Sequence, residues 1–313
     1  MATSQPAVHF GIVVPQFNAS WSQAREVAQA ADESGFDSVW VVDHLVSVLN
    51  EAETVLESWT EITAIGAITR RVRVGQMVLC VSFRHPPLLA KMAATLDQVT
   101  GGRLILGLGA GWHPGEYAQY GYPFPPIGTR LGQLDEACHI LRRLWTEERT
   151  TFEGRHFQVH DAVCDPKPVQ ARLPLMIGGG GEKVMLRVVA QHADIWNNLG
   201  AYHGEAAHKC AVLREHCRVA GRDPATILTT QQTLAAIALD RTDAARRGAK
   251  VVAELGFLDA TPALALIGTP DEIRSSVEKN RAFGINGFVM SFGRRTDPEH
   301  VRLFAREVIS AYR

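Results

Sequence analysis

The chain has 313 residues, with 32 Lys and Arg against 33 Asp and Glu, so its formal net charge is −1 with His neutral. Hydrophobic residues make up 46% and charged residues 21%, which is the composition of a globular protein and excludes a disordered chain. The balanced charge argues against a nucleic-acid partner, because neutralising phosphates needs a surplus of basic residues. The length fits either one barrel of roughly 250 residues with insertions or two domains.

No targeting or metal signal is visible. Segment 1–8 has neither a basic residue nor an apolar run, so no secretory signal is expected. No apolar run reaches the roughly 20 residues that span a bilayer, so we expect a cytoplasmic protein without a membrane partner. The 12 His contain no HExxH motif and the five Cys no CxxC pair, so no metal site is expected.

Strand-like and helix-like runs alternate through the first half of the chain. The expected strands are 8–14, 38–42, 72–81 and 103–107, and the expected helices are 21–33, 57–69, 87–99 and 130–146. Ser20 is the expected N-cap of the first helix, and Gly35 lies just past its end. Each helix therefore begins shortly after a strand ends, as in a repeated strand–helix unit.

The second half continues this alternation. The expected strands are 175–177, 193–197, 227–239 and 287–292, and the expected helices are 182–191, 205–220, 242–255, 271–283 and 298–312. Thr269 is the expected cap of the helix that starts after it, with Pro270 at the first position.

Eight strands alternating with helices predict an α/β fold, a (β/α)8 TIM barrel with insertions. No break in composition marks a second domain, so residues 1–313 are expected to form a single domain. Three stretches with poor periodicity, 111–128, 151–172 and 256–268, are the expected insertions, and 152–157 reads as a small hairpin. We expect these three stretches to shape the substrate pocket.

Four glycines, Gly178, Gly179, Gly180 and Gly181, stand between an apolar strand and a helix. A glycine-rich turn at a helix N-terminus presents backbone N–H groups to an anion, which predicts a phosphate or carboxylate site. The alternative is a turn chosen for tight strand–helix packing, but four consecutive glycines exceed what packing needs.

A second glycine run, at 107–111, does not match the dinucleotide fingerprint, because Trp112 occupies the third required glycine position. Two interpretations remain open: a strand end where a flat ring lies against the backbone, or a simple loop.

Polar and aromatic residues follow several strands. Asp43 and His44 end the second strand, and a His at that face of a barrel is a candidate acid or base, or else a structural residue. Arg84 either binds an anion or pairs with a carboxylate. Trp112 and Glu116 follow the fourth strand, as an aromatic wall with one carboxylate for a planar ligand or as plain packing.

Other enzyme classes find less support. There is no GxSxG, P-loop or HExxH motif. A glycosidase needs two carboxylates at strand ends, for which Asp43, Glu116 and Asp194 are the candidates, but no pairing is evident.

The chain resembles the luciferase-like monooxygenase superfamily, and within it the branch of oxidoreductases that use the deazaflavin coenzyme F420. The resemblance covers nearly the whole chain, in order. It rests on Phe36-Asp37-Ser38-Val39-Trp40-Val41-Val42-Asp43-His44, Arg84-His85-Pro86 with Lys91 and Leu96-Asp97, Gly101-Gly102-Arg103, Gly107-Leu108-Gly109-Ala110-Gly111-Trp112 with Glu116, Tyr120-Gly121-Tyr122-Pro123-Phe124-Pro125, Phe152-Glu153-Gly154, and the four glycines with Ala193-Asp194.

This resemblance implies a homodimer with a deazaflavin or flavin ring at the mouth of the barrel. It implies that His44 lies near the reacting carbon, with Glu116 as a second catalytic candidate. It implies a cis peptide bond between Met77 and Val78 behind the ring. The remaining cofactor-binding residues it implies are Asp43, Cys80, Gly109, Ala110, Gly111, Trp112, Gly178, Gly179, Gly180 and Gly181, with Lys183 as a helper.

The resulting hypothesis is an F420-dependent oxidoreductase that transfers a hydride to or from a small organic substrate. The substrate is not expected to be a sugar phosphate, because 45–49 contains no Trp and the basic residues that grip such a phosphate in related dehydrogenases are not evident. The alternatives are an FMN-dependent monooxygenase on the same barrel and, in another class, a non-catalytic cofactor-binding barrel.

Overall fold

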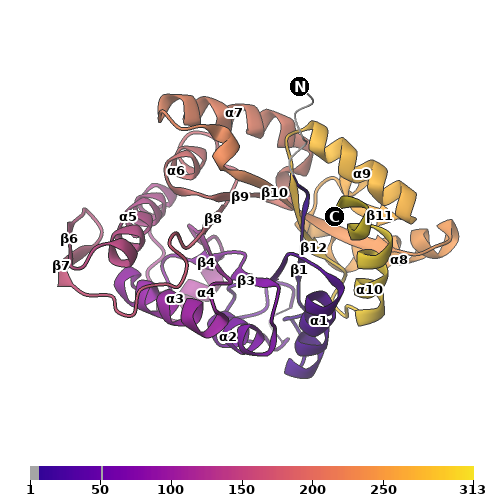
Figure 1. Cartoon of the computed structure of the whole chain (residues 1–313), viewed down its shortest axis with the longest axis horizontal. Helices are drawn as coiled ribbons and strands as arrows, with labels where there is room; N and C mark the ends of the chain where they lie inside the picture. Colours follow the sequence, from indigo (N-terminus) through magenta and orange to yellow (C-terminus); the bar gives the residue numbers. More distant parts are fainter. Residues whose placement is uncertain (1–6, 51) are drawn as a thin grey trace.

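The computed structural model describes residues 7–50 and 52–313, and it contains a closed barrel of eight parallel strands surrounded by helices (Figure 1). The barrel order is β1-β2-β3-β5-β8-β9-β10-β12, and β12 pairs with β1 to close it. These strands are β1 His9–Val13, β2 Ser38–Val41, β3 Arg73–Gln76, β5 Leu104–Gly109, β8 Leu175–Gly178, β9 Ile195–Asn198, β10 Leu228–Ile237 and β12 Gly287–Ser291. The predicted TIM barrel is confirmed.

The main helices lie outside the strands and cover them. They are α1 Trp21–Ser34, α2 Ser58–Ile68, α3 Pro86–Thr100, α5 Ile127–Thr146, α6 Met185–His192, α7 Ala206–Val219, α8 Arg241–Leu255, α9 Pro270–Ala282 and α10 Pro298–Glu307. The predicted caps are confirmed: Ser20 forms a capping box with Gln23, Gly35 takes the left-handed conformation at φ 93°, and Thr269 forms a capping box with Glu272.

Two apolar layers hold the barrel together. One lies between strands and helices, where side chains such as Phe10, Ile62 and Leu106 are fully buried. The other fills the barrel interior with Trp40, Met77, Ile105, Met176, Ile195 and Val289. A filled interior means that ligands are confined to the mouth, where the strands end and the connecting loops begin.

The structure corrects the predicted elements at several points. The run 72–81 is divided into β3 and a short strand β4 Leu79–Cys80, with a cis bond between Met77 and Val78. The stretch 111–128 contains helix α4 Pro114–Gln119. The stretch 256–268 contains the turns η3 Gly256–Leu258 and η4 Pro262–Leu264, and β11 Leu266–Gly268, which pairs with the last residues of β10. Elements of two to six residues are too short to show a periodic pattern in the sequence.

Other segments follow the expectation more closely. The hairpin of the stretch 151–172 is present as β6 Thr150–Glu153 and β7 Gln158–Ala162. Short 3-10 turns precede α7 (η1 Gly200–Glu205), precede β10 (η2 Pro224–Thr226) and end the chain (η5 Ile309–Tyr312). Among the described residues, no helix has both the length and the apolar character needed to cross a membrane. The single-domain boundaries stay a prediction, and the signal-peptide expectation falls largely on residues 1–6, outside the described residues.

Candidate functional site at the mouth of the barrel

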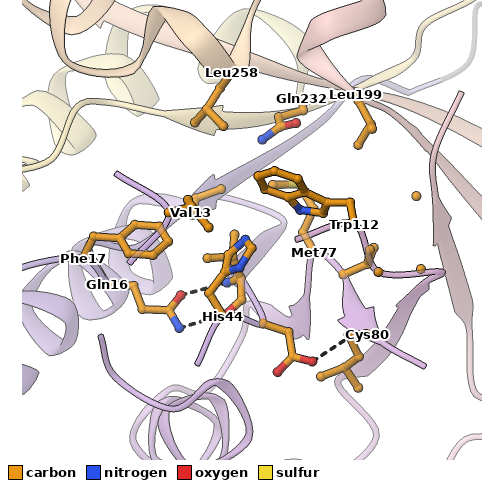
Figure 2. Close-up of a pocket in the computed structure, with 18 of the residues that line it drawn as sticks. Val13, Gln16, Phe17, His44, Met77, Cys80, Trp112, Leu199, Gln232 and Leu258 are labelled. Atoms are coloured by element: carbon orange, nitrogen blue, oxygen red, sulfur yellow. Dashed lines mark hydrogen bonds between the residues drawn. The ribbon is translucent and has the colours of Figure 1, made fainter. Parts of the chain in front are cut away.

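A cavity of about 530 Å³ opens where the barrel strands end (Figure 2). This volume lies within the range of small-molecule sites. Its walls come from β4 and β10, from the segments after β1, β2, β3, β5, β8, β9 and β12, and from the loop after α8. In Figure 2, His44 lies between Gln16 and Phe17 on one side and Trp112 on the other.

His44 is held by Glu116. The Nδ1 atom of His44 lies 3.1 and 3.0 Å from the two carboxylate oxygens of Glu116, which comes from α4. Glu116 also accepts the backbone N–H groups of Leu45 at 2.7 Å and Val46 at 3.3 Å. Burial would raise the pKa of Glu116, but these hydrogen bonds and His44 outweigh it and hold the pKa below its ordinary value. An ionised Glu116 accepts a proton-bearing Nδ1, so Nε2 is the ring nitrogen left for chemistry.

Asp43 is occupied by a different set of partners. Its carboxylate accepts the backbone N–H of Cys80 at 2.8 Å and both terminal nitrogens of Arg84, at 2.8 and 3.0 Å. Arg84 also donates to Glu57 at 2.7 Å. Of the two interpretations of Arg84, pairing with a carboxylate is the one the structure bears out. Asp43 lines the cavity, but its oxygens fix β4 in place.

Cys80 is not a reactive thiolate. Its Sγ lies 2.9 Å from the hydroxyl of Tyr117, and burial raises the pKa of the thiol. Burial also raises the pKa of the Tyr117 hydroxyl. Both groups therefore stay protonated and neutral at the cavity wall.

Val78 explains the glycines that end β5 and β8. The predicted cis bond between Met77 and Val78 is confirmed. The Val78 side chain packs against the backbone of Gly109 and Gly178. A Cβ on Gly109 would come within 2.5 Å of Val78, and one on Gly178 within 3.0 Å. These glycines leave room for Val78, and all three residues line the cavity.

Close packing requires glycine at most positions of the four-glycine run, contrary to the expectation from the sequence. A Cβ on Gly179 would lie 2.9 Å from Met185, and one on Gly180 would lie 2.4 Å from the ring of Tyr202. Packing therefore accounts for three of the four glycines, Gly178 included. Gly181 alone has space, and neither it nor Gly180 lines the cavity.

The end of this run also differs from the expectation. Helix α6 begins at Met185, three residues later than predicted, so a turn separates the glycines from the helix N-terminus. Lys183 is exposed and lies outside the cavity wall. The lysine that contacts the run is instead the buried Lys209, which donates to the Gly180 carbonyl at 2.9 Å and lies 4.4 Å from the centre of the Tyr202 ring. Nothing in local spacing signals Lys209, because it comes from α7.

Aromatic side chains border His44. Trp112 is exposed and meets the His44 ring edge to face, with 5.9 Å between centroids. The ring of Phe17 lies 5.9 Å from His44 on another side. Ala110 and Gly111 line the same wall, so the expected aromatic and glycine surface for a planar ligand is assembled at one place.

Sequence reasoning missed two glutamines. The Gln16 amide donates to the carbonyls of Val42 and Leu56, at 2.8 and 2.7 Å, and accepts the Val42 N–H at 2.8 Å, which pins the loop that carries His44. Gln232 lies on β10 and lines the cavity opposite. Neither stands in a motif, so no sequence signal could have identified them.

The surroundings of the cavity give the glycosidase alternative no support and correct one expectation. Asp194 lies just before β9, at the opposite end of the barrel, where it pairs with Arg142 and with Arg172 at 2.8 Å. With Asp43 and Glu116 both saturated by partners, the carboxylate pair of a glycosidase is not assembled. The stretch 151–172 contributes no lining residue, so two of the three insertions, not three, shape this cavity.

Comparison with known proteins places this geometry in a family. Residues 8–287 match the family of luciferase-like monooxygenases. An F420-dependent glucose-6-phosphate dehydrogenase of Intrasporangium calvum is 37% identical over 157 residues, 49% of this chain and 47% of that protein. The chain therefore spans about half the length of the curated relatives it matches.

Solved structures share the fold over the whole chain. A structure described as an F420-dependent secondary alcohol dehydrogenase with an F420–acetone adduct superposes with a TM-score of 0.84 at 23% identity, covering 98% of this chain and 100% of that one. A monooxygenase of Streptomyces bottropensis gives 0.82 at 24% identity, covering 97% and 100%. At these identities the likeness establishes the fold alone, and the fold serves more than one chemistry.

Proposed function

The chain belongs to the luciferase-like monooxygenase family, and from this premise we propose that it is an oxidoreductase that uses F420 to exchange a hydride with a small organic substrate. The observation that carries the proposal is His44, oriented by the ionised Glu116 at the wall of an apolar cavity at the barrel mouth. The F420-dependent relatives support this choice of cofactor.

The cavity residues fit a planar, largely uncharged ring. Val78, Ala110 and Trp112 offer apolar contact surface, and Gly109 and Gly111 expose backbone. Bound F420 would supply a carbon that accepts or donates a hydride. Gly178 and Gly179 would bind nearest the ring, and Gly180 and Gly181 would meet the cofactor's phosphate outside the cavity proper.

In this proposal His44 is the catalytic residue and Glu116 a positioning residue. When an alcohol loses a hydride, its hydroxyl must also lose a proton, and Nε2 of His44 is the group available to take it. Glu116 keeps the proton of His44 on Nδ1 and favours the charged ring that results. Gln16 holds the loop after β2 so that His44 stays in this orientation.

The charges at the cavity favour an uncharged substrate. Among the described lining residues, Arg294 is the one with a permanent positive charge, and its guanidinium pairs with Glu53. Its backbone N–H donates to Glu254 at 3.0 Å. A phosphate monoester would therefore meet no unpaired cation here. We propose a small alcohol or carbonyl compound instead of the sugar phosphate of the curated relatives.

Titration of the purified protein tests the cofactor. F420 and FMN are added separately, and binding is followed by the change in each cofactor's visible absorbance. Tight binding of F420 with weak binding of FMN is expected; the reverse preference would establish the FMN-dependent monooxygenase instead.

Activity assays test the substrate class. We expect turnover of an uncharged secondary alcohol but not of glucose 6-phosphate. F420 binding without turnover of any substrate would support the non-catalytic cofactor-binding barrel. The homodimer and the cytoplasmic location stay predictions from the sequence.

A further inference from the structure

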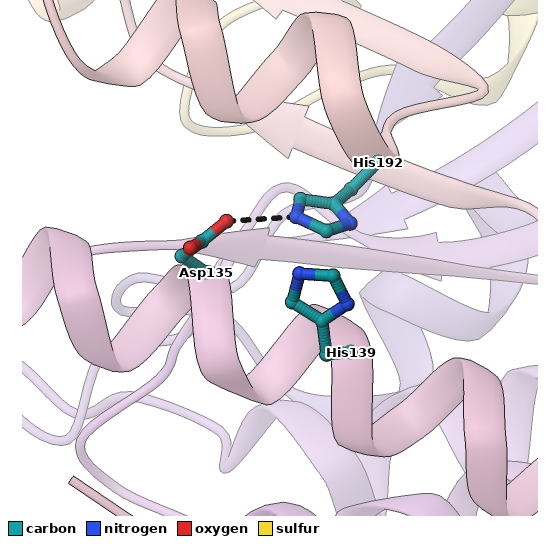
Figure 3. Close-up of side chains that lie close together, drawn as sticks. All are labelled: Asp135, His139 and His192. Atoms are coloured by element: carbon teal, nitrogen blue, oxygen red, sulfur yellow. Dashed lines mark hydrogen bonds and ion pairs between the residues drawn. The ribbon is translucent and has the colours of Figure 1, made fainter. Parts of the chain in front are cut away.

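Three potential metal ligands meet on the outer wall of the barrel, between α5 and α6 (Figure 3). Asp135 and His139 are four residues apart on α5, so they lie on one face of that helix. His192 is the last residue of α6 and packs against them. We infer that Asp135, His139 and His192 form a binding site for a divalent transition-metal ion, with Zn²⁺ as the reference ion.

The geometry of the three side chains suits one ion. One ligand atom from each residue lies within 4.8 Å of the other two. Nε2 of His192 is 2.7 Å from Oδ1 of Asp135, and the two imidazole rings are 4.4 Å apart at an interplanar angle of 84°. An ion between these atoms would replace the direct hydrogen bond with two metal bonds after a small side-chain adjustment.

The donor set selects the class of ion. Two imidazole nitrogens and one carboxylate oxygen are ligands that Zn²⁺ and its neighbours in the first transition row prefer. Mg²⁺ and Ca²⁺ take oxygen ligands almost throughout, so they are disfavoured here. Three protein ligands leave one tetrahedral position, which water can fill because His139 is exposed.

A second buried histidine shows what a purely structural arrangement looks like. His203 is fully buried, and both its ring nitrogens have protein partners: Asp259 at 3.1 Å and Asn280 at 2.7 Å. The cluster on α5 and α6 differs, because its two histidines place their rings together around one carboxylate. No hydrogen bond joins the ring of His139 to another described residue, so it is available to bind an ion.

The neighbouring charges set the expected strength of the site. Arg187 is one of the positive charges that act on Asp135, and it competes with a bound cation for that carboxylate. Arg143, one turn beyond His139, is drawn away by Glu147 at 2.7 Å and by the Thr151 carbonyl at 2.8 Å. An ion here would join α5 to α6 and stabilise the folded chain in proportion to its concentration. The cluster lies on the barrel's outer wall, outside the cavity lining, so we assign it no part in hydride transfer.

Metal binding is measured on untagged protein after removal of metals with a chelator. Co²⁺ alone should give the visible absorption band of a tetrahedral site, saturating at one ion per chain. Zn²⁺ should displace the bound Co²⁺ and raise the melting temperature by several degrees.

The decisive variant is His139→Ala, because His139 is exposed and its removal leaves the His192–Asp135 hydrogen bond intact. Affinity for Co²⁺ should fall by about 100-fold or more in this variant.

His160→Ala is the matched control, because His160 is exposed on β7 and lies outside the cluster. It should bind Co²⁺ as the wild type does. The metal-free melting temperatures of both variants report whether either substitution disturbs the fold. Failure of the wild type to give the saturable band, or equal Co²⁺ affinity in wild type and His139→Ala, would overturn the site. Because the readout needs no F420, these outcomes are independent of the proposed function.

Discussion

The barrel mouth and the outer wall each contain a histidine joined to a carboxylate, but the two pairs differ in their surroundings. At the mouth, the His44 ring lines an open cavity, and its partner Glu116 is buried and tied to two backbone N–H groups. On the outer wall the burial is reversed, since His192 is buried while Asp135 is partly exposed beside a second histidine. At the mouth, the pair therefore orients the His44 ring toward the cavity. On the outer wall, the pair contributes two of the three proposed metal ligands.

The comparison shows that a histidine–carboxylate contact does not define a function by itself. The two regions differ in which partner is buried: the carboxylate at the mouth and the histidine on the outer wall. At the mouth the carboxylate is fixed and the ring faces apolar space that a substrate can fill. On the outer wall the ring is fixed and the carboxylate faces solvent and another imidazole. Catalysis at the mouth depends on this difference, so substitutions there test it.

Substitution of His44 by Ala should have the largest effect. Removing the general base should lower turnover by about 10²- to 10⁴-fold. F420 binding should change little, because the other residues proposed to contact the cofactor remain. Steady-state kinetics and cofactor titration measure the two effects separately. The control is His160→Ala, on the hairpin, which should leave both unchanged. Full turnover by the His44→Ala protein would show that His44 is not catalytic. The two histidine–carboxylate pairs would then no longer differ in the way proposed.

Glu61 shows what happens to a buried carboxyl without a histidine. It lies on α2, is as well buried as Glu116, and neither of its carboxylate oxygens has a hydrogen-bond partner among the described residues. Burial, and then repulsion by Glu57, raises its pKa from 4.5 to about 8. The two glutamates therefore differ in protonation at neutral pH, since His44 and two backbone amides keep Glu116 ionised.

This contrast predicts a pH dependence of stability. Between pH 4.5 and about 8 the folded chain keeps the Glu61 proton that the unfolded chain releases, so the free energy of unfolding should fall as pH rises through this window. Glu61→Gln should remove that slope and stabilise the protein at pH 8 by a few kcal/mol, of the order set by ~1.4 kcal/mol per pH unit. Denaturant unfolding at pH 5, 6.5 and 8 measures it, with the exposed Glu148→Gln as control. Parallel pH curves for wild type and Glu61→Gln would refute the assignment.

The sequence predicted the barrel but not most of the partners within it. Apolar runs alternating with capped helices identify the eight strand–helix units, because burial of each element is a local property of its residues. His44 and Glu116 were both candidates, yet their contact joins positions 72 residues apart and has no signal in local spacing. For the same reason local spacing favours Lys183 over Lys209, and it gives no sign that Asp135 and His192, 57 residues apart, are neighbours.

The smallest of the expected effects separates the two roles at the mouth. Glu116→Gln keeps an acceptor for the Leu45 and Val46 N–H groups and for Nδ1 of His44, but it removes the negative charge beside the ring. A positioning residue predicts a loss of about 10- to 100-fold in kcat with little change in KM. If Glu116 were itself the proton donor or acceptor, the variant would lose activity as completely as His44→Ala.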